Sequence, residues 1–195
     1  MSVRGLLLLL GVALLSGGLA YWAPSPVRPA LPVDEAEPAL AFPALGPALD
    51  TVTRIRIEED DGLLLLVRNS ASWEVAVDGG EAVAADGDRV AALLGGLAGL
   101  RLAEEKTRLP GRHGLIAVDD PADGGGGARI TVYDLDDRVR ADLILGTVRI
   151  PPAPGLPGEM FVRRPDAVQA WLARGSLHLP AAGAWAASDE DRLPK

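Results

Sequence analysis

The sequence predicts an α+β domain behind a single membrane-spanning helix, and three observations support this. Apolar and polar residues alternate in several short stretches after residue 51, which is typical of strands with one buried face. Two further stretches repeat apolar residues at helical spacing, and one uninterrupted apolar run lies near the N-terminus. We therefore expect a mainly antiparallel sheet with helices on one face, preceded by one transmembrane helix.

The apolar run, residues 6–22, is about 26 Å long as a helix, which is at the short end for a membrane span. Arg4 precedes the run and favours a cytoplasmic N-terminus, whereas Tyr21 and Trp22 suit the opposite headgroup layer. Residues 1–23 are therefore predicted to anchor the domain on the periplasmic side of the inner membrane.

A cleaved signal peptide is the alternative to a retained anchor, because residues 18–20 offer small side chains for cleavage before Tyr21. Both interpretations export the domain, and we favour the anchor because the leucine-rich core is long for a signal peptide. The chain has no cysteine, so lipid attachment at a lipobox and disulfide bonds are excluded.

The rest of the chain divides into three parts by composition. Residues 24–48 are rich in proline and are predicted to form an extended, semi-rigid spacer. Within this spacer, residues 42–45 are apolar again and predict the first contact with the folded body. Residues 49–187 form the predicted domain, and residues 188–195 form an acidic tail.

The domain begins with three predicted strands and a helix. The strands cover residues 52–58, residues 63–68 and a short stretch from Trp73, with an acidic turn between the first two. Asp86 is the predicted N-cap of the helix. One helix face carries the apolar residues Val90, Leu93, Leu94, Leu97 and Leu100.

A second series of elements follows in the same order. Strands are predicted at residues 129–134, 138–145 and 159–163. A helix is predicted to start near Pro165, with Val168, Trp171 and Leu172 on one face. We therefore expect two βββα repeats, with Trp73 and Phe161 in equivalent third strands and both helices on the same face of the sheet.

Charge and aromatic content exclude several partners. The formal net charge is −8 and the pI is about 4.8, so nucleic acid and anionic lipid surfaces are not expected partners. Aromatic residues make up only 4%, which disfavours a surface that stacks on bases or sugars.

Motifs for metal binding are incomplete in this sequence. Asp134, Asp136 and Asp137 begin like a calcium loop but lack its glycine and distal glutamate, so a solvated hairpin turn is predicted. His113 and His178 are the only histidines, and a zinc site would need both together with carboxylates. We predict no metal-binding residue.

Motifs for catalysis and cofactor binding are equally weak. Residues 124–127 are glycines without a following phosphate-binding helix, so a flexible connector is predicted. Ser176 near His178 lacks a nucleophile elbow. Residues 104–106 are charged and would protect a strand edge from aggregation. Trp73, Trp171 and Trp185 are predicted to be core or core-rim residues, and no catalytic or cofactor-binding residue is predicted.

An ordered set of short motifs resembles the domain-of-unknown-function family 4340 over about residues 42–185. The motifs are FPAL at 42–45, VTRIRI at 52–57, WEV at 73–75, LRLAEEKT at 100–107, HGL at 113–115, DDP at 119–121, ILG at 144–146, FVRRP at 161–165 and WLA at 171–173. This chain is short between residues 107 and 114 and ends soon after Trp185, which are departures from the family pattern.

The resemblance implies a bacterial envelope protein with an N-terminal membrane helix, often encoded beside subunits of ABC-2-type transporters and gliding-motility-type proteins. It implies no enzymatic activity and no cofactor. We therefore expect a non-catalytic, membrane-anchored accessory protein that binds a membrane or periplasmic protein through a sheet edge or its acidic surface. The alternative is a periplasmic ligand-binding protein or enzyme that uses a carboxylate-lined cleft between the two repeats.

Overall fold

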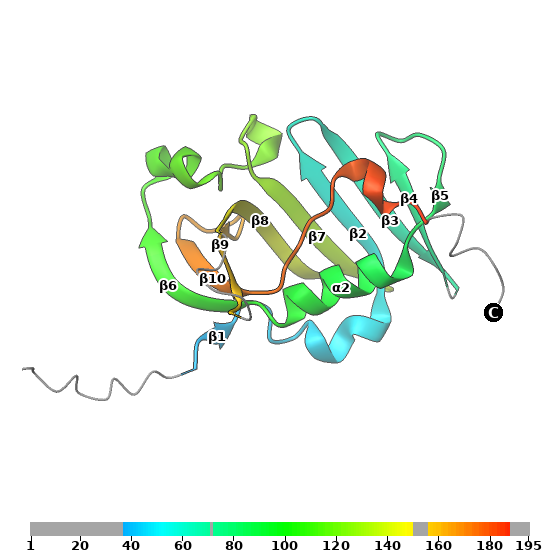
Figure 1. Ribbon diagram of the computed structural model, residues 1–195, viewed down its shortest axis with the longest axis horizontal. Coiled ribbons are helices and arrows are strands. Elements are labelled where there is room, and N and C mark those ends of the chain that lie inside the picture. The colour runs from blue at the N-terminus through cyan, green and yellow to red at the C-terminus, as the bar shows by residue number, and fades with distance from the viewer. Residues whose placement is uncertain (1–36, 71, 150–155, 188–195) are drawn as a thin grey trace, which may run out of the picture. The chain divides into compact units, whose positions relative to one another are not determined.

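The computed structural model of the protein describes residues 37–70, 72–149 and 156–187 (Figure 1). Within these residues, no helix is long and apolar enough to cross a membrane. The predicted anchor, residues 1–23, and the predicted acidic tail, residues 188–195, lie outside the described residues, as does the first part of the spacer.

The described residues form one antiparallel sheet of ten strands, in the spatial order β1-β6-β10-β9-β8-β7-β2-β3-β4-β5. The strands are β1 (Ala39–Leu40), β2 (Val52–Glu59), β3 (Gly62–Asn69), β4 (Ser72–Val77), β5 (Val83–Ala84), β6 (Arg101–Thr107), β7 (Ala128–Asp134), β8 (Val139–Arg149), β9 (Gly158–Arg163) and β10 (Ala170–Gly175). The helices are α2 (Gly87–Ala98) and the 3₁₀ helices η1 (Gly46–Thr51), η2 (Pro110–Ile116), η3 (Pro121–Asp123) and η4 (Ala182–Trp185).

The predicted α+β class is wrong, because the described fold is mainly β and its single α-helix is α2. The predicted second helix is replaced by strand β10, where Trp171 pairs with Val162 and Leu172 pairs with Phe161 of β9. A short apolar run fits both helical and strand spacing, and here hydrogen-bonding partners on both sides favour the strand.

The two halves of the fold meet at the central pair of β2 and β7, where Ile55 pairs with Val132. From this pair, β3 and β4 extend the sheet in one direction, and β8 and β9 extend it in the other. Six strands therefore lie where the alternating pattern predicts them, but the second half lacks the helix of a βββα repeat. Trp73 in β4 packs on the face that α2 covers, whereas Phe161 in β9 packs on the opposite face, so the two are not equivalent.

Helix α2 crosses the sheet from the β5 edge to the β6 edge (Figure 1). It begins where predicted, because the Asp86 carboxylate accepts hydrogen bonds from the backbone N–H groups of Asp88 and Arg89 at 3.0 and 3.1 Å. Four buried residues of α2 pack into the main core, namely Val90, Leu93, Leu94 and Leu97.

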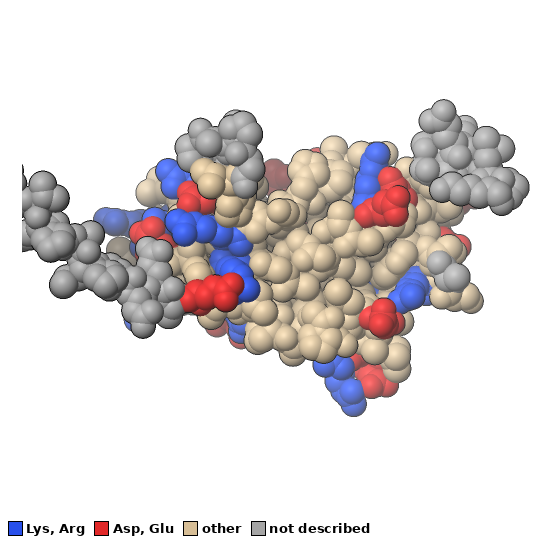
Figure 2. Space-filling view, turned by 60° about the horizontal axis from the view of Figure 1, so that its bottom comes forward, with Lys and Arg blue, Asp and Glu red and all other residues tan. Residues whose placement is uncertain are grey.

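The C-terminal segment, residues 176–187, runs beside α2 over the same face of the sheet (Figure 1). Its Trp185 is fully buried, and the carbonyl oxygen of Trp185 accepts a hydrogen bond from the Asp86 N–H at 2.9 Å. Gly96 permits this close packing, since a Cβ there would lie 2.8 Å from the Ser176 carbonyl oxygen. Figure 2 shows that the centre of the face formed by η1 and α2 is free of charged side chains, which gather at its margin.

Residues 37–48 belong to this folded body, although the sequence analysis places them in the spacer. Strand β1 pairs with the start of β6, and Phe42 and Leu45 are buried in the core. On the face opposite α2, a smaller core forms where the loop after β6 covers the sheet. That core contains Val118, Ile144, Ala170, Ile116 and Phe161.

Candidate functional site

Two adjoining depressions share the lining residues Asp120, Pro165 and Asp166. The larger has a volume of about 740 Å³ and lies between residues 139–142 of β8, residues 42–44 and the turn after β9. We call it the β8 groove. The smaller, which we call the η2 pocket, has a volume of about 410 Å³ and lies between η2, η3 and the same turn. Both volumes fall within the range of about 300–1,000 Å³ that is typical of ligand sites.

The β8 groove exists because β8 extends beyond its neighbour β9. Strand β9 ends at Arg163, which pairs with Ile144. Residues 139–143 of β8 therefore pair with β7 on one side, and the β9 ladder does not reach them on the other. Among the described residues, no strand pairs with the side of β8 that faces away from β7 along this stretch, and residues 139–142 line the groove.

Arg163 holds the chain away from this open side. Its guanidinium is buried, and its Nε donates a hydrogen bond to the Val118 carbonyl oxygen at 2.8 Å. Its Nη1 donates to the carbonyl oxygens of Arg164, Pro165 and Ala167 at 3.2, 3.1 and 3.0 Å. One side chain thus fixes both the turn after β9 and the loop before β7.

The floor of the groove contains a cluster around Arg129. Its Nε and Nη2 donate to the two carboxylate oxygens of Asp142 at 3.0 and 2.8 Å, and its Nη1 donates to Asp120 at 3.2 Å. The hydrogen bonds to Asp142, followed by the charges of Asp142 and Asp120, raise the pKa of Arg129 above its usual value against the effect of burial. Asp142 and Asp120 are therefore both bound by the same guanidinium.

Asp134 lies at the end of β7, beside the groove, and is buried. It accepts backbone N–H groups of Asp136 and Arg138 at 2.9 and 3.0 Å, and the Arg140 guanidinium at 2.7 and 2.6 Å. Burial alone would raise the pKa of Asp134, but these hydrogen bonds and the Arg140 charge lower it. The predicted hairpin turn is present. Its Asp134 carboxylate is buried, and it holds the turn through the hydrogen bonds from the N–H groups of Asp136 and Arg138.

The rim of the two depressions has an excess of negative charge. Among the described residues, Asp119, Asp123 and Asp166 form no ion pair within 4.0 Å, and Asp123 and Asp166 are exposed. Arg164 is the cation on the same rim, where it donates to the Ala41 carbonyl oxygen at 2.6 Å and lies over the Phe42 ring. The three carboxylates line the η2 pocket, which therefore favours positively charged groups, whereas Asp166 and Arg164 both line the β8 groove.

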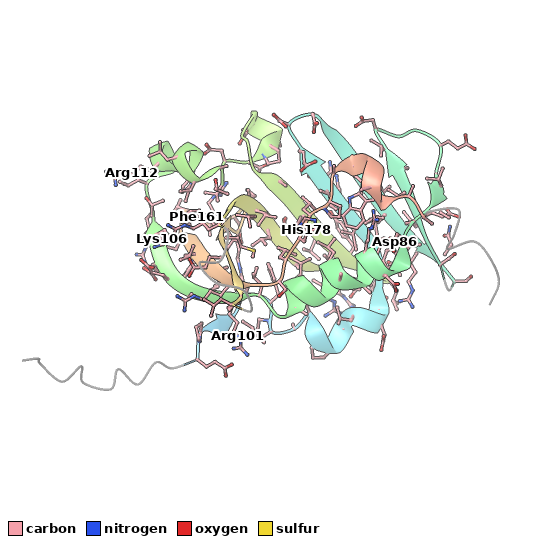
Figure 3. All side chains as sticks on the ribbon, viewed as in Figure 1. Asp86, Arg101, Lys106, Arg112, Phe161 and His178 are labelled. Carbon is pink, nitrogen blue, oxygen red and sulfur yellow. The ribbon has the colours of Figure 1, made fainter. Side chains whose placement is uncertain are left out.

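The two histidines do not meet. His113 is buried beside the η2 pocket, with its Nε2 3.0 Å from the Val168 carbonyl oxygen. His178 lies over the sheet on the α2 side, far from Arg112, the neighbour of His113 (Figure 3). Among the described residues, no group of three or more His, Asp or Glu side chains is arranged to hold a metal ion. Ser176 belongs to the same C-terminal segment as His178.

The glycine run, residues 124–127, is more tightly packed than the predicted flexible connector would be. Gly125 and Gly127 are buried, and a Cβ on Gly127 would lie 2.6 Å from the Ile144 side chain. The predicted flexibility is therefore wrong at these positions.

Two other predictions from the sequence can be compared with the structure. Trp185 is buried, and Trp73 and Trp171 pack partly buried against the core, as predicted. Glu104 and Lys106 pair with each other at 2.7 Å on β6, where Lys106 marks the outer edge of the sheet (Figure 3).

The sequence analysis missed the cluster around Arg129 and the role of Arg163. A signal for the cluster was present, because Arg129 and Asp142 alternate with the core residues Ile130 and Leu143 and therefore share the other face. No pattern in the sequence indicated that one side of β8 would lack a partner strand. Comparisons with protein-family models, curated proteins and solved structures found no match.

Proposed function

We propose that this protein is a non-catalytic accessory protein of the bacterial envelope whose domain binds another membrane or periplasmic protein. The apolar run after Arg4 supports a single anchor with the domain on the periplasmic side of the inner membrane. The resemblance to the domain-of-unknown-function family 4340 supports association with an ABC-type transporter complex.

The observation that carries the proposal is the acidic rim of the η2 pocket, whose Asp166 also lines the β8 groove. The carboxylates of the floor are already bound to arginine, whereas Asp119, Asp123 and Asp166 remain available to a cationic partner. An open depression with charged residues on its rim is typical of a surface that recognises another protein. Complementary charge would also speed association with a basic partner.

The alternative function, that of a ligand-binding protein or enzyme, has less structural support. Its expected cleft between the two halves is occupied by the continuous β2–β7 ladder. The β8 groove does contain Asp120 and Asp142, but both carboxylates already accept hydrogen bonds from Arg129. The groove therefore favours protein binding over acid–base chemistry.

The test is crosslinking in intact membranes, followed by mass spectrometry of the captured species. The rim variant carries Asp119→Asn, Asp123→Asn and Asp166→Asn. The control variant removes the same charge from exposed residues outside both depressions, with Asp50→Asn, Glu81→Gln and Asp88→Asn. We expect a partner that the wild type and the control capture and the rim variant loses. Equal capture by all three proteins would contradict the proposal.

A further inference from the structure

The free side of β8 is a strand edge inside a groove. Residues 139–143 are in strand conformation and their ladder partners lie in β7 alone. A strand edge of this kind presents backbone N–H and C=O groups that can pair with an additional strand. Five residues at about 3.3 Å each offer roughly 16 Å of edge, which is the length of a short strand.

The protein's own chain is held away from this edge. Arg163 fixes the carbonyl groups of the turn after β9, and Pro165 within that turn has no N–H to donate. Strand β9 therefore cannot continue past Arg163 to pair with residues 139–143 of β8. The β8 groove of about 740 Å³ lies between the edge and this turn, and residues 139–142 line it. Val139, Arg140 and Asp142 are the residues of the edge that solvent reaches, since Ala141 and Leu143 are buried.

The walls of the groove differ on the two faces of the sheet. Arg140 and Asp142 lie on the open face and line the groove together with Asp166. Val139 and residues 42–44 offer apolar contacts, with Val139 52% exposed. An added strand would alternate its side chains between these surfaces. Basic side chains suit the rim, and apolar side chains suit Phe42 and Val139.

We infer that the free side of β8 binds an extended, basic segment of a partner protein as an added strand, whose Lys or Arg side chains pair with Asp166 in the groove and with Asp119 and Asp123 in the adjoining η2 pocket. This inference rests on the proposed protein-binding function and specifies the chemistry of the partner. Backbone pairing supplies general affinity, and the charges on the rim select a segment of opposite charge.

The probe is a short peptide of alternating Lys and Val with blocked ends, added to the full-length chain in a mild detergent. Binding is measured by fluorescence anisotropy, and the site is located by hydrogen–deuterium exchange. We expect exchange to slow at residues 139–143 and to stay unchanged at residues 103–107 of β6. Among the residues that the structure describes, the latter residues also have no partner strand on their outer side, since β1 pairs only with Arg101 and Leu102. They are an internal control.

Two control peptides separate backbone pairing from charge. A peptide of alternating Glu and Val keeps the backbone donors but reverses the charge, and a fully N-methylated Lys–Val peptide keeps the charge but has no backbone donor. We expect both to bind at least tenfold more weakly than the probe. The rim variant should weaken the probe on the order of tenfold, because the ion pairs of three carboxylates are lost. The matched control variant should bind the probe like the wild type.

Three results would overturn the inference: no binding of the probe, equal binding of the N-methylated peptide, or protection on β6 instead of β8. The proposed function is judged separately by the crosslinking experiment. If the rim variant loses its membrane partner but the probe leaves residues 139–143 unprotected, the protein-binding function stands and strand addition is excluded.

Discussion

Arg129 on β7 binds both carboxylate oxygens of Asp142 on β8, across the face of the sheet that α2 does not cover. Asp120, at the start of η3, binds the same guanidinium from the loop above. The pair thus joins two adjacent strands to the loop that forms one wall of the groove. Both side chains are about one quarter exposed, so the interaction is only partly screened by water.

Replacing Asp142 with alanine is expected to lower the free energy of unfolding by about 1–2 kcal/mol, because a charge-assisted bidentate contact is lost. Urea denaturation measures the change. The control is Asp136→Ala, which removes an exposed pair with Arg138 and should cost less than about 1 kcal/mol. Equal losses in the two variants would contradict a structural role for the Arg129–Asp142 contact.

Asp134 predicts a specific dependence of stability on pH. Its pKa is lowered in the folded state, so its ionised form stabilises the fold at neutral pH. This contribution is complete above the unfolded pKa of about 3.9 and is lost as the pH falls through the lower folded value. The Asp134→Asn variant should be less stable at pH 7 and should lose less additional stability than the wild type on acidification below pH 4. Denaturation curves at several pH values measure both effects, and parallel curves would contradict them.

Gly95 and Gly96 are neighbours in α2 with opposite expected responses to alanine. A Cβ on Gly95 meets no atom within 4 Å, so Gly95→Ala should stabilise the protein by about 0.5–1 kcal/mol through helix propensity. A Cβ on Gly96 would meet the backbone of Ser176 and Leu177. Gly96→Ala should therefore destabilise the protein by about 1–3 kcal/mol. Thermal unfolding of the two variants provides the comparison, and stabilisation by both would disprove the tight contact with the C-terminal segment.

The N-terminal anchor is tested by mass spectrometry of the mature chain and by membrane fractionation. We expect the intact N-terminus in the membrane fraction. Replacing Leu9 with arginine should cost about 3 kcal/mol of insertion free energy and reduce the membrane-bound amount. A mature chain that begins at Tyr21 would show that the segment is a cleaved signal peptide.

The candidate site could not be located from the sequence, which predicted no site residue and placed the possible cleft between two repeats. The DDP motif with Asp120 and the FVRRP motif with Arg163 both contribute to the two depressions, but the sequence indicated them only as parts of the family resemblance. The sequence predicts a solvated hairpin turn at Asp134, because the motif only begins like a calcium loop. In the structure Asp134 is buried and paired with Arg140, and these contacts define its role. Ion pairs between strands depend on register, which a single sequence specifies only through its alternating pattern.

The sequence by itself determined the strands at the centre of the sheet and the start of α2. Alternation at Ile55 and Ile57, and the capping residue Asp86, are local signals that do not depend on distant contacts. The tertiary structure decided that residues 170–175 form a strand, since β6 and β9 supply backbone partners on both sides. The tertiary structure also decided which side of β8 has no partner strand. The free side of β8 results from where β9 ends and from the carbonyl groups that Arg163 binds, and both depend on residues far apart in the chain.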